Sequence, residues 1–128
     1  MRRQAARALA AILSGVTDTA EHTPAEVHEL LAADGEIQLV DVREPHEHEA
    51  GAIAGAKHVP LQELMAAAEQ LDPNRPVVFY CRVGGRSQMA TDAFRASGWD
   101  ARNMSGGIVA WVEAGLPLSD PDGTVADH

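Results

Sequence analysis

The sequence predicts an α/β domain in which a central, mostly parallel sheet of about five short strands is flanked by helices on both faces. Short apolar runs that suit strands alternate along the chain with stretches of helical periodicity. Strands and helices that alternate in this way form parallel sheets. One run, "VVFYC" at residues 77–81, is apolar throughout, which is typical of a strand buried on both faces. The length of 128 residues suits a single domain.

The first half of the chain predicts one helix and two strands. The helix covers residues 23–35, which begin with a capping threonine and a proline and end in glycine. The apolar run "IQLVDV" follows as a strand that ends at Asp41. Residues 43–56 predict a loop with one helical turn, and residues 57–60 predict a second short strand.

The second half of the chain continues the alternation. Residues 61–71 have helical periodicity, and the "DPNRP" that follows them is a turn. The strand at residues 77–81 leads into a helix that begins at Arg86 or Ser87 and is closed by Gly98. "WDARNM" predicts a further short strand, and "GGIVAWVEAGLP" predicts a final helix.

The chain divides into three segments with no repeats and no second domain. We expect a helical amino-terminal extension at residues 1–22, the α/β domain at residues 23–118 and a flexible tail at residues 119–128. The basic start and apolar middle of the extension leave a signal peptide as an alternative. Because that middle is short and interrupted by Arg7, and no clear cleavage site follows, we favour an amphipathic helix that lies on the domain.

Charge and composition exclude several classes of partner. A formal net charge of −9 opposes attraction to nucleic acid and to anionic membrane surfaces, and no apolar stretch is long enough to span a bilayer. We therefore expect neither a nucleic-acid partner nor a membrane. A single cysteine allows no internal disulfide and fits a reducing compartment, so we expect a cytoplasmic location. The oligomeric state stays open.

The segment "CRVGGRS" carries the most distinctive chemistry. It consists of Cys81, Arg82, Val83, Gly84, Gly85, Arg86 and Ser87. The two glycines allow the backbone N–H groups to turn inward around one point, and the following helix adds the positive end of its dipole. With two arginines beside it, this loop favours a thiolate, so we expect a lowered pKa and a nucleophilic sulfur at Cys81. The alternative, an inert buried cysteine, leaves the glycines and arginines without a purpose.

The position of the loop adds to its interest. In a parallel sheet the functional site lies at the carboxyl ends of the strands, and both Cys81 and Asp41 end a predicted strand. A cysteine-dependent phosphatase needs an arginine six positions after the cysteine. Here that position is Ser87, and Arg86 comes one residue too early. A ring of this size suits one sulfur atom carried on the cysteine better than a phosphoryl group.

Three motifs resemble those of single-domain rhodaneses, which are sulfurtransferases. They are "DVREPHEHEAGAIAGAKHVP", "CRVGGRS" and "GGIVAWVEAGLPL", in the order and spacing of the family, and the resemblance runs from about residue 23 to residue 118. The chain departs from the family pattern at Ala52, which is often histidine, and at His48, which is usually aromatic. Both departures lie in a segment that we expect to be structural.

The resemblance implies a two-step exchange. Cys81 takes a sulfur atom from a donor such as thiosulfate, rests as a persulfide inside the loop, and passes the sulfur to a thiol or cyanide-like acceptor. A protein persulfide could replace thiosulfate as the donor. No metal and no organic cofactor are needed, because the cysteine is the carrier. Arg82 would guide an anionic donor, and Arg86 would either do the same or pair with a carboxylate of the first motif and brace the loop.

Other candidate residues have weaker claims. We expect Asp41 and Arg43 to support the site, with Asp41 bonded to neighbouring backbone and Arg43 paired with Glu44, Glu47 or Glu49. The histidines His46 and His48 suggest a metal pair, but no third ligand is evident nearby, and solvated side chains explain them as well.

Two alternative functions remain open. A non-catalytic rhodanese-like module that binds or regulates is the first, although such modules commonly lose the cysteine. A thiol redox sensor is the second, and it would need an external thiol because the chain has no second cysteine.

Overall fold

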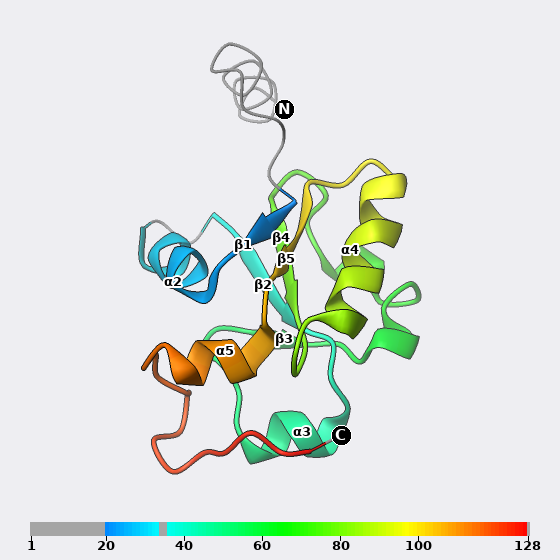
Figure 1. Cartoon of the computed structure of the whole chain (residues 1–128). Coiled ribbons are helices and arrows are strands. Elements are labelled where there is room, and N and C mark those ends of the chain that lie inside the picture. The colour runs from blue at the N-terminus through cyan, green and yellow to red at the C-terminus, as the bar shows by residue number, and fades with distance from the viewer. Residues whose placement is uncertain (1–19, 34–35, 128) are drawn as a thin grey trace.

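The computed structural model describes residues 20–33 and 36–127, and it contains a five-stranded parallel sheet (Figure 1). The strand order is β1-β5-β4-β2-β3. The strands are β1 (Glu21–His22), β2 (Gln38–Asp41), β3 (Lys57–His58), β4 (Val77–Tyr80) and β5 (Ala101–Met104). The predicted α/β class with a parallel sheet is therefore confirmed. Strand β1 lies just before the predicted domain boundary, and it is too short to leave a pattern in the sequence.

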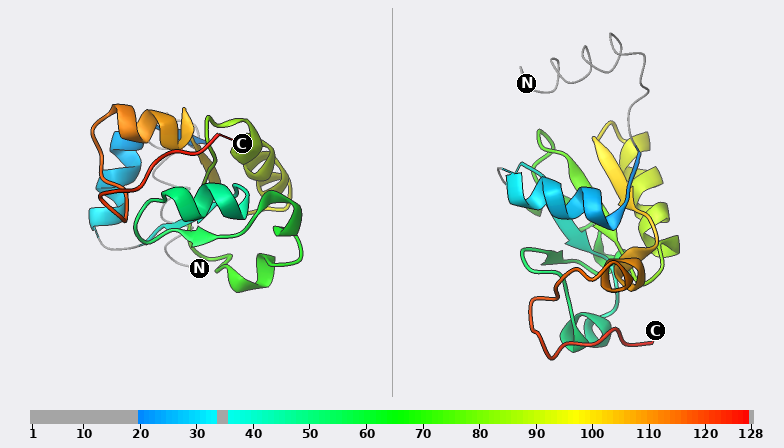
Figure 2. Two further views of the ribbon diagram at one scale, coloured as in Figure 1. Left: turned by 90° about the horizontal axis from the view of Figure 1, so that it is seen from below. Right: turned by 60° about the vertical axis from the view of Figure 1, so that its left-hand side comes forward.

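Helices cover both faces of the sheet, as predicted (Figures 1 and 2). They are α2 (Pro24–Ala33), α3 (Pro45–Ala50), α4 (Gly85–Ala96) and α5 (Gly107–Glu113). Successive residues of β4 point to opposite faces, so Phe79 packs in the core that includes Phe94 of α4, whereas Tyr80 packs in the core that includes Trp111 of α5. Both faces of β4 are buried, which explains its continuous apolar sequence.

The prediction of a helix at residues 61–71 is wrong. The segment forms two 3₁₀ turns, η1 (Leu61–Glu63) and η2 (Ala68–Gln70), with other turns between them. Its apolar residues recur at intervals of about three, and they pack against the core on the α4 side; they are Leu61, Leu64, Ala67, Ala68 and Leu71. A spacing of three matches the 3₁₀ repeat, in which such residues share one side.

The tail lies along α3 and ends near the loop that follows β4 (Figures 1 and 2). Two backbone hydrogen bonds help to attach it to the domain: Ser119 N donates to Ala52 O at 2.7 Å, and Thr124 N donates to Ala50 O at 2.8 Å. At Gly51, an added Cβ would lie 2.3 Å from the Thr124 carbonyl oxygen, so only glycine allows this approach. The sequence predicts flexibility here, and it does not predict these contacts.

The expected helical extension falls on residues 1–22, of which residues 1–19 lie outside the described part of the chain. Among the described residues, every helix is too short or too polar to span a lipid bilayer.

Candidate functional site

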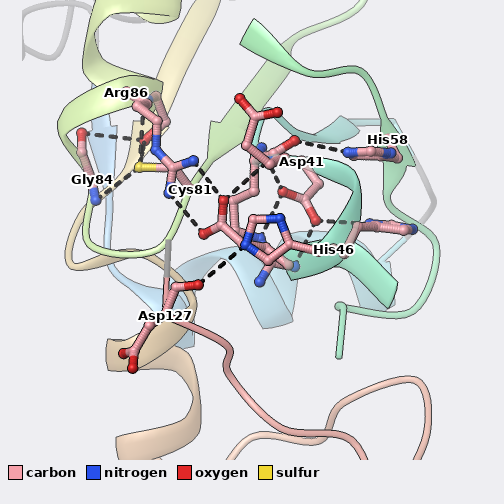
Figure 3. Close-up of polar contacts among 12 residues, drawn as sticks. Asp41, His46, His58, Cys81, Gly84, Arg86 and Asp127 are labelled. Atoms are coloured by element: carbon pink, nitrogen blue, oxygen red, sulfur yellow. Dashed lines mark hydrogen bonds and ion pairs between the residues drawn. The ribbon is translucent and has the colours of Figure 1, made fainter. Parts of the chain in front are cut away.

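Cys81 follows β4 directly, and the next loop encloses its sulfur (Figure 3). The residue is 1% exposed. The backbone N–H groups of Gly84 and Ser87 donate to Sγ at 3.1 and 3.4 Å, and the Ser87 hydroxyl oxygen lies 3.4 Å from it. Gly84 has a φ of 111°, in the region that favours glycine, and this turn directs the backbone donors inward. Of the N–H groups predicted to turn inward from residues 82–87, those of Gly84 and Ser87 contact the sulfur.

Helix α5 holds the outer side of this loop. The N–H groups of Ile108 and Val109 donate to the carbonyl groups of Cys81 and Arg82 at 2.9 and 3.1 Å. Gly107 makes this approach possible, because a Cβ there would lie 2.3 Å from the Arg82 carbonyl oxygen. Since α5 satisfies these carbonyl groups, the loop is free to present its N–H groups to the sulfur.

The surroundings of Cys81 favour the thiolate. Burial opposes ionisation, but hydrogen bonds from the Ser87 side chain and from the N–H groups of Ser87, Gly84 and Val83 hold the pKa of Cys81 below its ordinary value. The 12-residue helix α4 begins in the same loop and directs its positive end toward the site. The pKa direction agrees with the prediction from sequence. A sulfur in this environment is a good nucleophile and a good carrier of an anionic adduct.

Arg86, labelled in Figure 3, pairs with Glu47 of α3. Its two terminal nitrogens donate to the two carboxylate oxygens at 2.7 and 2.9 Å. Burial alone would raise the pKa of the fully buried Glu47, but hydrogen bonds from Arg86 and from the Glu44 backbone N–H lower it below its ordinary value. Of the two roles expected for Arg86, this geometry fits the bracing one. A bidentate pair fixes both side chains in one arrangement.

Arg82 meets a different partner at the edge of the site. Its Nη2 lies 3.3 Å from Oδ1 of Asp127 in the tail, a side chain that is 97% exposed. The Asp127 carbonyl oxygen also lies 3.2 Å from Nε2 of His46 on α3 (Figure 3). This ion pair is open to water, so the Arg82 guanidinium can exchange Asp127 for another anion.

Asp41 and Arg43 form a buried pair beside the site. Nε and Nη2 of Arg43 donate to the two Asp41 oxygens at 2.8 and 2.7 Å, and the Arg43 backbone N–H donates to Asp41 at 3.0 Å. Nη2 also donates to the Gly51 carbonyl at 2.8 Å, and the Tyr80 hydroxyl donates to Asp41 at 3.1 Å. The expected bond from Asp41 to backbone is present. The expected pairing of Arg43 with a glutamate is wrong, because the Arg43 guanidinium pairs with Asp41, which lies two residues earlier in the chain.

The histidines of this segment have separate partners. His48 lies 2.8 Å from Asp41 through Nδ1 and stacks on the ring of His58, with ring centres 4.3 Å apart. His46 is turned to Asp127 instead. Within residues 20–33 and 36–127, no three His, Cys, Asp or Glu residues are grouped so that they could hold a metal ion. Ala52 is buried and accepts the tail hydrogen bond from Ser119.

Asn103 is a site residue that the sequence does not single out. It lies on β5, is 4% exposed, and contacts the Ser87 hydroxyl through Oδ1 at 2.5 Å. The available signal is a polar residue near the carboxyl end of a predicted strand. A single polar residue in a short strand is common on surfaces, so this signal is weak without the fold.

Comparison with known sequences finds one family. The family model described as "Rhodanese-like domain" matches residues 23–114. A protein named "Sulfurtransferase" from Allochromatium vinosum is 36% identical over 94 residues, which cover 73% of this chain and 88% of that protein. The human "Thiosulfate:glutathione sulfurtransferase" is 35% identical over 99 residues, which cover 65% of this chain and 85% of that protein. An HTH-type transcriptional regulator from Mycobacterium tuberculosis is 39% identical over 89 residues, but the chain spans only 39% of its length.

Solved structures give the same result. A rhodanese-related protein from Thermoplasma volcanium superposes with a TM-score of 0.71 at 28% identity, over 77% of this chain and 95% of that one. A rhodanese-like domain protein from Staphylococcus aureus superposes with a TM-score of 0.69 at 30% identity, over 78% of this chain and 98% of that one. These neighbours share the fold that positions the Cys81 loop.

Proposed function

Because the chain belongs to the rhodanese-like domain family, we propose that it is a sulfurtransferase that carries a sulfane sulfur on Cys81. Relatives with sulfurtransferase names support this type of enzyme. The donor in our proposal is a small anion such as thiosulfate, and the acceptor is a thiol or cyanide. A protein persulfide remains an alternative donor. The lone cysteine fits a reducing compartment, so we place the activity in the cytoplasm.

The proposed reaction has two displacements. In the first, the Cys81 thiolate attacks the outer sulfur of thiosulfate, and a new S–S bond forms. The S–S bond of thiosulfate breaks, and its electron pair leaves with sulfite. In the second, the acceptor attacks the terminal sulfur, the Cys81 persulfide bond breaks, and the thiolate returns. Electrons balance within these steps, so the cysteine alone carries the group.

The ring of donors around the sulfur carries the proposal. The N–H groups of Gly84 and Ser87 already contact Sγ in the free thiol. The loop could hold the negative charge of a persulfide sulfur in the same way, because preorganised donors cost no reorganisation when charge develops. The open ion pair of Arg82 would give an anionic donor a first point of attachment.

The decisive experiment is intact-mass spectrometry before and after thiosulfate, followed by cyanide. We expect wild type to gain one sulfur atom and to lose it to cyanide. Cys81→Ser should gain none, and wild type alkylated at Cys81 beforehand should gain none either. A Cys81→Ser variant with full sulfurtransferase activity would refute the mechanism. If wild type gains nothing from thiosulfate but loads from a protein persulfide, the donor is the protein.

A regulatory role, as a thiol redox sensor, is the second candidate, and one relative is named as a transcriptional regulator. The mycobacterial transcriptional regulator contains a matching segment in a longer chain. In that role Cys81 would be oxidised by peroxide and then form a disulfide with an external thiol, since the chain has no second cysteine. Faster reaction with peroxide than with any sulfane sulfur donor would favour the sensor.

A further inference from the structure

A row of polar side chains connects the exposed face of α4 with the sulfur of Cys81. Its members are Asp92, Gln88 and Ser87 on α4 and Asn103 on β5. Asp92 is exposed, whereas Ser87 and Asn103 are buried. The row therefore runs from water into the site, and each contact in it has a defined donor and acceptor.

The Ser87 hydroxyl has three acceptors within reach and one proton to donate. Asn103 Oδ1 is the nearest at 2.5 Å, the Gly84 carbonyl oxygen lies at 3.2 Å, and the Cys81 sulfur lies at 3.4 Å. The short O–H···O distance marks the strongest of these bonds. Asn103 therefore competes with the sulfur for this proton, so the Ser87 hydroxyl gives the sulfur only part of its hydrogen bonding and the backbone N–H groups supply the rest.

The far end of the row fixes the orientation of the Asn103 amide. The Asp92 carboxylate only accepts hydrogen bonds, so Nε2 of Gln88 faces it, at 2.9 Å. Oε1 of Gln88 then faces Asn103 and accepts from its Nδ2 at 3.1 Å. The same Nδ2 donates to the Gly84 carbonyl at 3.4 Å. This leaves Asn103 Oδ1, an acceptor, toward Ser87.

We propose that Asn103 is a positioning residue for Cys81. By accepting a hydrogen bond from the Ser87 hydroxyl, Asn103 limits the hydrogen bonding that this hydroxyl can give to the Cys81 sulfur. The inference rests on the proposed function of Cys81 as a sulfur carrier. In the first displacement the sulfur must attack, and an extra hydrogen bond to a thiolate weakens it as a nucleophile. In the second, Cys81 is the leaving group, and the same bond helps it to leave. Asn103 sets the balance between these two requirements.

The charged groups around Cys81 are kept in every variant used to test this proposal. They are Arg86 at the start of α4, its partner Glu47 on α3, and Arg82 in the loop. The variants are all neutral replacements of neutral residues. A change in the ionisation of Cys81 can therefore be assigned to hydrogen bonding.

The test is the rate of Cys81 alkylation by iodoacetamide as a function of pH. We expect Asn103→Leu to lower the midpoint of this profile by about half a pH unit, because the freed hydroxyl proton turns to the thiolate. Ser87→Ala should raise the midpoint by a similar amount. The double variant should match Ser87→Ala. A midpoint that is raised or unchanged in Asn103→Leu overturns the proposal. A double variant whose midpoint lies below that of Ser87→Ala overturns it as well.

Gln88→Leu keeps the proposal testable if Asn103→Leu fails to fold. It removes the group that orients the Asn103 amide and changes no charge, so we expect a lowered midpoint, by less than in Asn103→Leu. An unchanged midpoint would overturn the proposed orientation. Ser97→Ala removes an exposed hydroxyl elsewhere near the end of α4 and should change nothing. Alkylation needs no sulfur transfer, so these results stand whether or not thiosulfate loads the protein.

Discussion

Arg82 and Arg86 lie in the same loop, and each meets a carboxylate from a distant part of the chain. Arg86 holds the buried Glu47 through two short bonds, at 2.7 and 2.9 Å. Arg82 holds the exposed Asp127 through a single contact of 3.3 Å. A buried bidentate pair fixes geometry, whereas an exposed pair is weak and exchanges readily. Two arginines that look equivalent in the sequence thus have different partners: Arg86 holds a buried carboxylate, and Arg82 holds an exposed one. We expect them to have separate tasks, Arg86 in shaping the loop and Arg82 in receiving an anion.

Breaking the buried pair should have the largest effect. Glu47→Gln leaves Arg86 without its counter-charge beside the loop, and we expect thiosulfate turnover to fall by about 10- to 100-fold and the free energy of unfolding to fall by about 2 to 3 kcal/mol. Steady-state kinetics and urea denaturation measure the two quantities. Glu49→Gln, on the exposed side of the same helix, is the matched control and should resemble wild type. Equal behaviour of the two variants would show that the loop holds its shape without this pair.

The same pair should make stability depend on pH in the acid range. The folded state lowers the pKa of Glu47 from its ordinary value of 4.5, so its contribution is complete above that value and is lost as pH falls through the lower folded-state pKa. We expect the urea midpoint of wild type to fall on acidification below about pH 4.5. Asp41, whose pKa is also lowered by Arg43 against the effect of burial, contributes in the same direction. Glu47→Gln should therefore show a smaller acid loss, and an equal loss would contradict the assignment.

Removing Arg82, the arginine whose partner is exposed, should affect binding and leave stability unchanged. In Arg82→Ala we expect the KM for thiosulfate to rise about three- to tenfold, because the donor loses a cation at the entrance, while the urea midpoint stays within error. Arg82→Lys keeps the charge and should retain most of the affinity. If Arg82→Ala lowers turnover and stability as Glu47→Gln does, the two arginines have the same task after all.

The smallest effect should come from the tail. Asp127→Asn removes the anion that competes for Arg82, so we expect the KM for thiosulfate to fall by about twofold at low ionic strength. Salt screens such exposed charges, and the difference should vanish in about 0.5 M NaCl. Asp122→Asn, also exposed in the tail, is the control and should leave the KM unchanged. A KM that rises in Asp127→Asn would mean that the tail helps to seat the donor.

The parts of the molecule that local sequence determines could be predicted. The buried strand at 77–81, the glycine-containing loop and the helix after it follow from adjacent residues, and so does the direction of the Cys81 pKa. The contacts that join distant segments could not be predicted. For Arg86 the resemblance implied pairing with a carboxylate of the first motif as one of two roles, but not that the partner is Glu47, 39 positions away. The contact between Ser87 and Asn103, 16 positions apart, left no signal in the sequence.

Three features differ from what the local sequence suggests. Residues 61–71 are alanine-rich and favour a helix locally, but packing against the core imposes a repeat of three. Strand β1 has two residues and exists because β5 pairs with it. Arg43 finds its partner two positions away in Asp41, although three glutamates follow it in the sequence. In the first two cases tertiary contacts decide the structure, whereas Arg43 forms a local ion pair with a residue that precedes it in the chain.

The bonds from α5 to the loop set an order of events during synthesis. A ribosome makes Cys81 before it makes Ile108 and Val109, whose N–H groups hold the carbonyl groups of Cys81 and Arg82. Those two carbonyl groups therefore stay without these partners until α5 has been made, and the loop around Cys81 reaches its final form late in synthesis.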